Sequence, residues 1–145
     1  MNTLNRKRSS LGIFILLGVA MLGCSSLPSP AHKQFTFPKD RAFFGDVKTP
    51  YQSLGLVRAK VNYESLDPIH DTDERRLCQT YFNKAVRELV KTARDKNGDA
   101  VIDVKSVVFL ENGEQQYFSK AECADDGLEG QVLVQGIAVK WKKLE

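Results

Sequence analysis

The chain has 145 residues, of which 42% are hydrophobic and 27% charged, a composition typical of a folded globular protein. Three of its 21 Lys and Arg residues lie at positions 6–8, so residues 24–145 carry 18 basic and 18 acidic side chains and no net charge. This balance excludes the strongly basic domain of a typical nucleic-acid-binding protein, so we expect no nucleic-acid partner. The length suffices for one domain with a modest core.

The first 23 residues have the organisation of a secretion signal. Arg6, Lys7 and Arg8 form a basic start, and residues 11–22 form an apolar run. A helix of this length, at about 1.5 Å per residue, falls well short of the ~30 Å hydrocarbon core of a bilayer. We therefore expect residues 1–23 to be a signal peptide. The alternative is an uncleaved membrane anchor.

Cys24 directly follows this run. Residues 21–24, Met-Leu-Gly-Cys, resemble the bacterial lipobox, with Met21 where Leu is commonest. The resemblance implies cleavage between Gly23 and Cys24, a diacylglycerol thioether on Cys24 and acylation of the new amino terminus. Several acyl chains on one residue anchor a protein to a membrane almost permanently. Ser25, which is not an aspartate, implies delivery to the outer membrane by resemblance to enterobacterial sorting signals. We expect the anchored domain to face the periplasm. The alternative is an ordinary signal peptide with a free Cys24.

Residues 24–50 predict a lipidated cysteine and a flexible tether, because Ser and Pro are frequent there. The folded domain is then expected over residues 51–145. Four phenylalanines interrupt the polar tether, and we favour their packing on the domain over contact with a partner or the membrane surface. They are Phe35, Phe37, Phe43 and Phe44.

Residues 51–63 predict the first strand, since apolar residues alternate with polar ones, and Gly55 is typical of a bulge. Residues 72–96 predict an amphipathic helix with Asp71 as its N-cap and Gly98 at its end. Most of its cations are expected on a solvated face. They are Arg75, Lys84, Arg87, Lys91 and Arg94.

The rest of the chain predicts strands. Residues 100–110 are rich in β-branched side chains, and Asn112-Gly113 indicates a hairpin returning over residues 115–120. The last strand is expected over 131–141, with Gly136 as a bulge and Trp141 packed under the sheet edge. The order β-α-β-β-β predicts an α+β fold in which one long helix packs on a small mixed or antiparallel sheet.

Two cysteines remain beside Cys24. Cys78 and Cys123 would enter a compartment where disulfides persist if the chain is exported. We favour one bridge between them, although two separate thiols remain the alternative if the helix holds them too far apart. No Cys-x-x-Cys spacing indicates a redox enzyme.

Two patterns suggest metal binding without meeting its requirements. Residues 95–103 imitate a calcium loop, but Ala100 and Ser106 replace the glycine and the closing glutamate that such a loop needs. His70 lies beside Asp71, Asp73 and Glu74, where helix capping explains the acids equally well. We therefore expect no metal and no cofactor.

Catalysis is equally unsupported. The two histidines, His32 and His70, have no glycine-flanked serine as a partner for a hydrolase triad. We therefore expect the protein not to be an enzyme.

Residues 51–141 resemble the Rcs-type outer-membrane stress-sensor lipoproteins. The likeness lies in residues 51–57, Cys78, residues 97–104, Cys123 and residues 136–139. It implies a compact α+β domain with a helix-to-strand disulfide, and binding to other envelope proteins without catalysis. Those sensors have two bridges where this chain has cysteines for one, so their signalling role is not carried over. We expect a lipid-anchored, non-catalytic binding or sensing module with an envelope protein as partner. The alternative is an envelope lipoprotein that binds a ligand or a metal ion at a site near His70.

Overall fold

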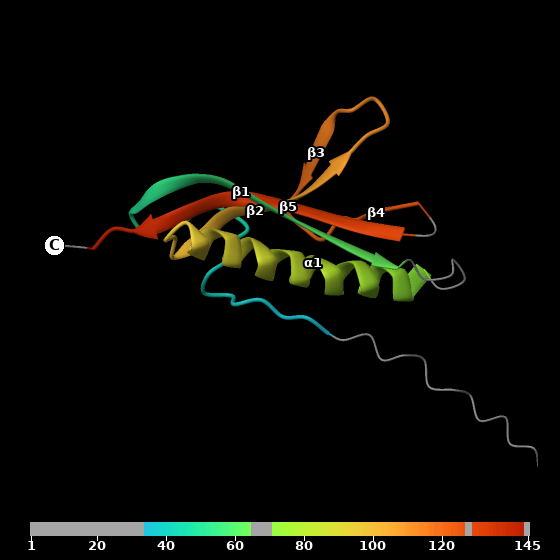
Figure 1. The fold of residues 1–145 in the computed structure, drawn as a ribbon, viewed down its shortest axis with the longest axis horizontal. Helices are drawn as coiled ribbons and strands as arrows, with labels where there is room; N and C mark the ends of the chain where they lie inside the picture. The colour runs from blue at the N-terminus through green and yellow to red at the C-terminus, as the bar shows by residue number, and fades with distance from the viewer. Residues whose placement is uncertain (1–33, 65–70, 127–128, 144–145) are drawn as a thin grey trace, which may run out of the picture. The chain divides into compact units, whose positions relative to one another are not determined.

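The computed structural model describes residues 34–64, 71–126 and 129–143. Within them one helix lies along one face of an antiparallel sheet (Figure 1), which confirms the predicted α+β class. The strand order is β1-β5-β2-β3, and β4 also pairs with β5. In chain order the elements are β1 (Tyr51–Glu64), α1 (Asp71–Asp95), β2 (Ala100–Phe109), β3 (Gln115–Phe118), β4 (Ala124–Asp125) and β5 (Glu129–Trp141). Among these residues no helix has the length and apolar character that a membrane crossing requires.

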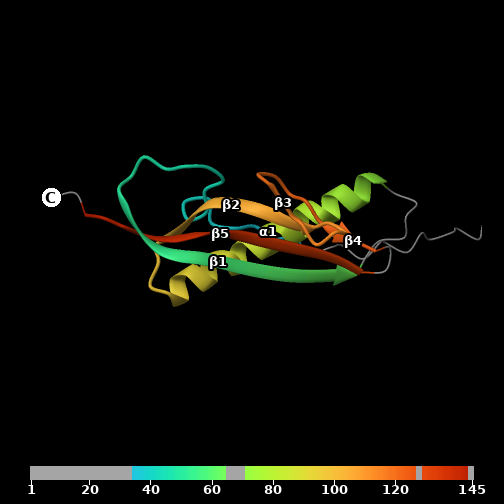
Figure 2. The ribbon, with the colours of Figure 1, turned by 90° about the horizontal axis from the view of Figure 1, so that it is seen from above.

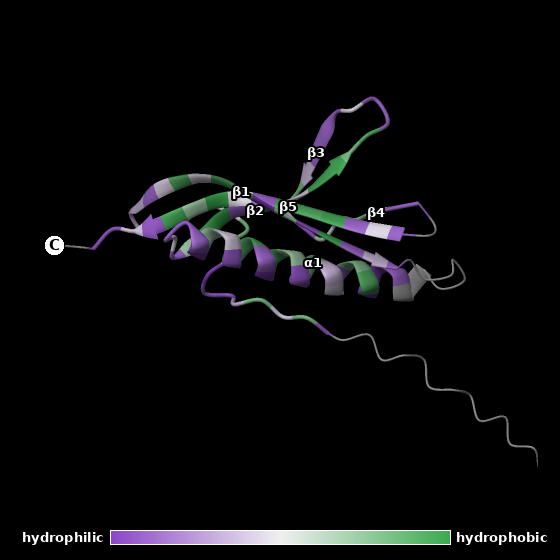
Figure 3. Ribbon diagram, in the orientation of Figure 1, coloured by the Kyte–Doolittle hydropathy of each residue, from purple (hydrophilic) through white to green (hydrophobic). Residues whose placement is uncertain are grey.

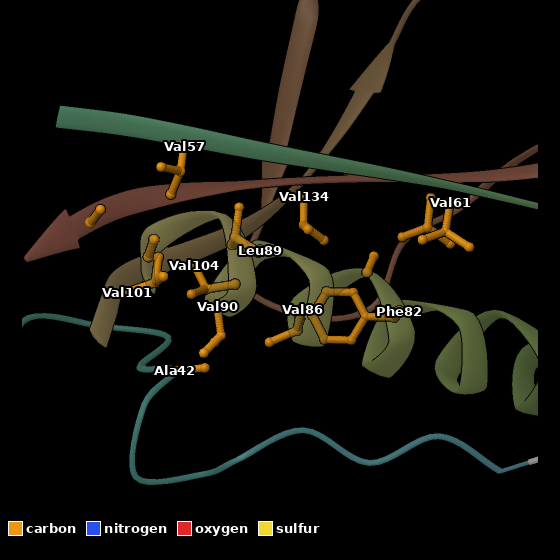
Figure 4. Packing of buried hydrophobic residues seen from close by; sticks show 14 of the residues in the cluster. Ala42, Val57, Val61, Phe82, Val86, Leu89, Val90, Val101, Val104 and Val134 are labelled. Carbon is orange, nitrogen blue, oxygen red and sulfur yellow. The ribbon is translucent and has the colours of Figure 1, made fainter. Parts of the chain in front are cut away.

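The main core lies between α1 and the sheet (Figure 4). Buried positions recur every three or four residues along α1, which is the spacing that places side chains on one face of a helix. Alternate residues of the strands meet them, because successive side chains of a strand point to opposite faces. The helix contributes Leu77, Phe82, Ala85, Val86, Leu89, Val90 and Ala93, and the strands contribute Val57, Val61, Val101, Val104, Val132, Val134 and Ala138.

Two strand irregularities involve glycine. The register of β1 against β5 shifts between Ser53 and Gly55, and Gly55 has a φ of 94°, which confirms the predicted bulge. The predicted bulge at Gly136 is wrong, since Gly136 pairs regularly with Val57. The extra residues lie across from it, on β2, between Ile102 and Lys105. Glycine is needed at 136 because a Cβ would lie 2.5 Å from Val101 Cγ1.

The helix ends in a Schellman motif. The Gly98 amide donates to the Ala93 carbonyl (2.8 Å), and the Asn97 amide donates to the Arg94 carbonyl (2.8 Å). The residue with the left-handed conformation is Asn97, with a φ of 61°, whereas Gly98 provides the close approach to Ala93. Gly98 therefore marks the end of the helix as predicted. Glycine is required there because the Ala93 carbonyl leaves no space for a side chain.

Part of the predicted tether belongs to the domain. Ala42 is buried and pairs in parallel with Val101 of β2, so residues 41–43 extend the sheet beside the first half of β2. The aromatic rings nearby also pack: Phe44 lies 5.8 Å from Phe82, and Phe43 lies edge-on to Trp141 at 6.0 Å. The four phenylalanines of the predicted tether thus pack on the domain, which is the alternative that we favoured. Residues 24–33 of the predicted tether lie outside the described residues.

Candidate functional site

The face of the sheet opposite α1 is the candidate binding site. Arg58 and Lys105 both pair with Gln135, so the three side chains share a row across this face. Lys60 pairs with Leu133 in the next row. We call this surface, viewed in Figure 2 with α1 behind the strands, the open sheet face. It comprises Leu56, Arg58, Lys60, Lys105, Val107, Phe109, Tyr117, Leu133 and Gln135.

Three large apolar side chains of this face are half exposed. Leu56 and Phe109 are each 50% exposed and Tyr117 is 48% exposed, and no other large hydrophobic residue of the described chain is as exposed. Tyr117 pairs with Val107, which lies two residues before Phe109 on β2. The two rings therefore lie on the same side of the β2–β3 ribbon. Figure 1 shows this ribbon rising away from α1, and Figure 3 colours its β2 half hydrophobic.

The charged side chains of the open sheet face are cations. Arg58 Nε donates to Gln135 Oε1 at 3.2 Å, which extends the guanidinium across β5. Lys105 Nζ lies 2.9 Å from Asp103 Oδ2, in the irregular part of β2 where Asp103 has a φ of 51°. Lys60 is exposed beside them. The face therefore combines exposed apolar groups with the positive charges of Arg58 and Lys60, whereas Asp103 balances the charge of Lys105.

The opposite end of this face is covered by the chain itself. Ile102 and Val139 are buried there beneath Phe43, Val47 and Trp141. The Trp141 amide donates to Asp99 Oδ2 at 2.9 Å, so the Asp99 carboxylate has a structural role. Packing of the tryptophan against the sheet, as predicted, is confirmed. The segment after residue 99 continues as β2, so the calcium-loop pattern is not followed by a helix.

The disulfide lies near the start of α1. Cys78 and Cys123 are joined with a Cα–Cα distance of 5.9 Å, which confirms the favoured pairing. The bond ties the helix to the segment between β3 and β4. Ser106 Oγ holds the same segment, donating to the Lys120 carbonyl (2.9 Å) and accepting from the Glu122 amide (3.2 Å). A surface hollow of about 540 Å³ borders the bridge.

Tyr63 is the titratable group with a clear shift in the described chain. Burial, followed by the negative charges of Asp125 and Glu74, raises the pKa of its phenol to about 12. Its ring stacks on Tyr81 with centroids 4.8 Å apart and lies against Gly130, where a Cβ would overlap it. The phenol thus stays neutral at ordinary pH and acts as a packing group.

Several predicted site residues lie outside the described residues. They are Gly23, Cys24 and His70. Within the described part of the chain, no group of three or more His, Cys, Asp or Glu side chains is placed to hold a metal ion. The metal alternative near His70 and the lipid attachment at Cys24 both stay predictions.

The comparisons with known proteins add little. No family model matches the chain, and no curated protein matches it. Among solved structures, it is similar to a protein of unknown function of the DUF74 family from Pediococcus pentosaceus, with 17% identity and a TM-score of 0.49. That match covers 70% of this chain and 96% of the other.

Proposed function

We propose that the protein is a lipid-anchored cell-envelope module that binds an envelope protein through its open sheet face, without catalysis. The lipobox-like residues 21–24 support the anchor. The disulfide between Cys78 and Cys123 supports export, because such bonds persist in oxidising compartments and are rare in the cytosol.

The observation that carries the proposal is the exposure of Leu56, Phe109 and Tyr117 on one side of the sheet. Exposed apolar groups that gather on one face are typical of protein interaction surfaces. Aromatic and Arg side chains are enriched at the centres of such surfaces, and Arg58 follows Leu56 on the same side of β1. Small ligands prefer concave sites, whereas these side chains stand on a strand surface and a rising ribbon. A protein partner therefore fits best.

The basic centre of the face indicates the charge of the partner. Arg58 and Lys60 would face an acidic or neutral surface, since like charges brought together on binding cost several kcal/mol. The partner's complementary patch is therefore expected to combine apolar groups with carboxylates.

Photocrosslinking in intact cells tests this function. A photoreactive phenylalanine analogue at position 117 should yield a discrete adduct with an envelope protein, and the same analogue at exposed Lys48 should not. Adding Leu56→Ala and Phe109→Ser should reduce the adduct about tenfold or more, because each truncated anchor removes ~1 kcal/mol or more of binding energy. Equal adducts from positions 117 and 48, or an adduct that survives both substitutions, would contradict binding through this face.

A further inference from the structure

A row of cations runs along the side of α1 that faces away from the sheet. Arg87, Lys91 and Arg94 follow one another at spacings of four and three residues, which places them on one side of the helix, and all three are exposed. They line a hollow of about 640 Å³ between α1 and the segment of residues 36–38. We call this hollow the basic groove.

The cations of the basic groove have no ion-pair partner among the described residues. The single carboxylate lining the groove, Glu88, forms no ion pair with any of them. Lys84, one turn earlier, lies 5.1 Å from the ring centre of Phe35. Like charges three and four residues apart repel one another on a helix, so an anion in the groove would relieve the repulsion along this row.

The path of the chain indicates which anion is near. Asn83 Nδ2 donates to the Phe35 carbonyl at 3.0 Å, and the Phe35 ring lies 6.0 Å from Tyr81, so residues 35–38 are fastened beside the groove. Gln34 is only ten residues from Cys24. Ten residues span at most about 35 Å, so acylation of Cys24 would keep the groove within reach of the bilayer surface.

We propose that the basic groove binds the phosphate groups of anionic lipids in the membrane that anchors the protein. This inference rests on the proposed lipid attachment at Cys24. Basic side chains are attracted to an anionic bilayer surface within about one Debye length, and the phosphate oxygens would satisfy the Arg87 and Arg94 guanidinium groups. The open sheet face lies on the other side of the sheet from α1 and would remain free for a protein partner (Figure 1).

Lysine labelling on vesicles tests the proposal. The lipidated protein, extracted from membranes, is reconstituted into phosphatidylcholine vesicles with or without phosphatidylglycerol and treated with an amine-reactive ester. Labelling of Lys91 should slow about fivefold in the anionic vesicles, the shift that one basic residue near such a surface gives. Lys60, on the open sheet face, is the matched control and should label equally in both. High salt should abolish the protection of Lys91.

A double variant and inorganic phosphate provide two further tests. Arg87→Gln with Arg94→Gln should restore the labelling of Lys91 in anionic vesicles with little change in stability, because both side chains are exposed. Equal labelling of Lys91 in both vesicle types would overturn the proposal, as would protection that persists in the variant. Suppose that inorganic phosphate protects Lys91 on phosphatidylcholine vesicles and phosphatidylglycerol does not. Free phosphate, and not the lipid, would then be the ligand.

Flotation separates this proposal from the anchor itself. If the protein floats with phosphatidylcholine vesicles but Lys91 labels equally in both vesicle types, the anchor works and the basic groove does not bind lipid. A protein that does not float with phosphatidylcholine vesicles has no working anchor, and the proposed function fails first.

Discussion

Replacing both bridged cysteines, Cys78→Ala with Cys123→Ala, is expected to lower the free energy of unfolding by about 4 kcal/mol. The bond joins residues 45 apart, so its loss frees a long loop in the unfolded chain. In the folded state, loss of the bond also loosens the segment before β4, which keeps its hydrogen bonds to Ser106 of β2. The midpoint of thermal unfolding should fall by about 15 °C in a domain of this size, as measured by circular dichroism.

The reduced wild-type protein is the control for this pair of substitutions. Because reduction breaks the bond and leaves both side chains in place, it should lower the midpoint by nearly the same amount. A fall of only a few degrees in either sample would show that the bridge contributes little to the stability of the fold.

Leu89→Ala is expected to cost about 3 kcal/mol of unfolding free energy. Leu89 is fully buried at the middle of the helix–sheet core (Figure 4), so its truncation leaves a cavity that its neighbours fill only in part. In urea unfolding, the midpoint should fall while the slope with denaturant concentration stays the same.

Leu56→Ala is the matched control, since it removes the same atoms from a side chain that is 50% exposed. Its cost should lie near 0.5 kcal/mol, as for most surface substitutions. Equal costs at the two positions would contradict the assignment of α1 to the covered face of the sheet and of Leu56 to the open face.

The elements were predictable where hydrophobic periodicity is strong. The helix expected over residues 72–96 is Asp71–Asp95, and the strand expected over 51–63 is Tyr51–Glu64. Both segments bury one side only, and the alternation or the three-to-four spacing of their apolar residues reports that side directly. The bridge was predicted from the number of cysteines and the expected export, although its geometry needed the structure.

Features that depend on tertiary packing were not predictable. Ala42 is buried because β2 leaves half of its edge open, and nothing in the composition of residues 41–43 indicates this pairing. The strand β4 has two residues, too few for a periodic pattern. Gly136 meets Val101 of a strand distant in sequence, so its role is steric and was mistaken for a bulge.

The open sheet face was missed for a related reason. Ile137 and Val139 of β5 alternate with Ala138, so both sides of this strand look apolar in sequence. The structure covers Val139 with Phe43 and Trp141 but leaves Leu56 and Phe109 half exposed. Phe43, one of the residues that cover this end, comes from the segment expected to be a tether, so the sequence did not indicate which apolar positions remain uncovered.

Intact mass spectrometry of protein from separated membrane and soluble fractions tests the proposed anchor most directly. The protein should be found in the membrane fraction as a chain beginning at Cys24, heavier by diacylglycerol and an amide-linked acyl group, with Cys78 and Cys123 oxidised. An unmodified chain in the soluble fraction, or a membrane-bound chain that still begins at Met1, would contradict lipid attachment at Cys24.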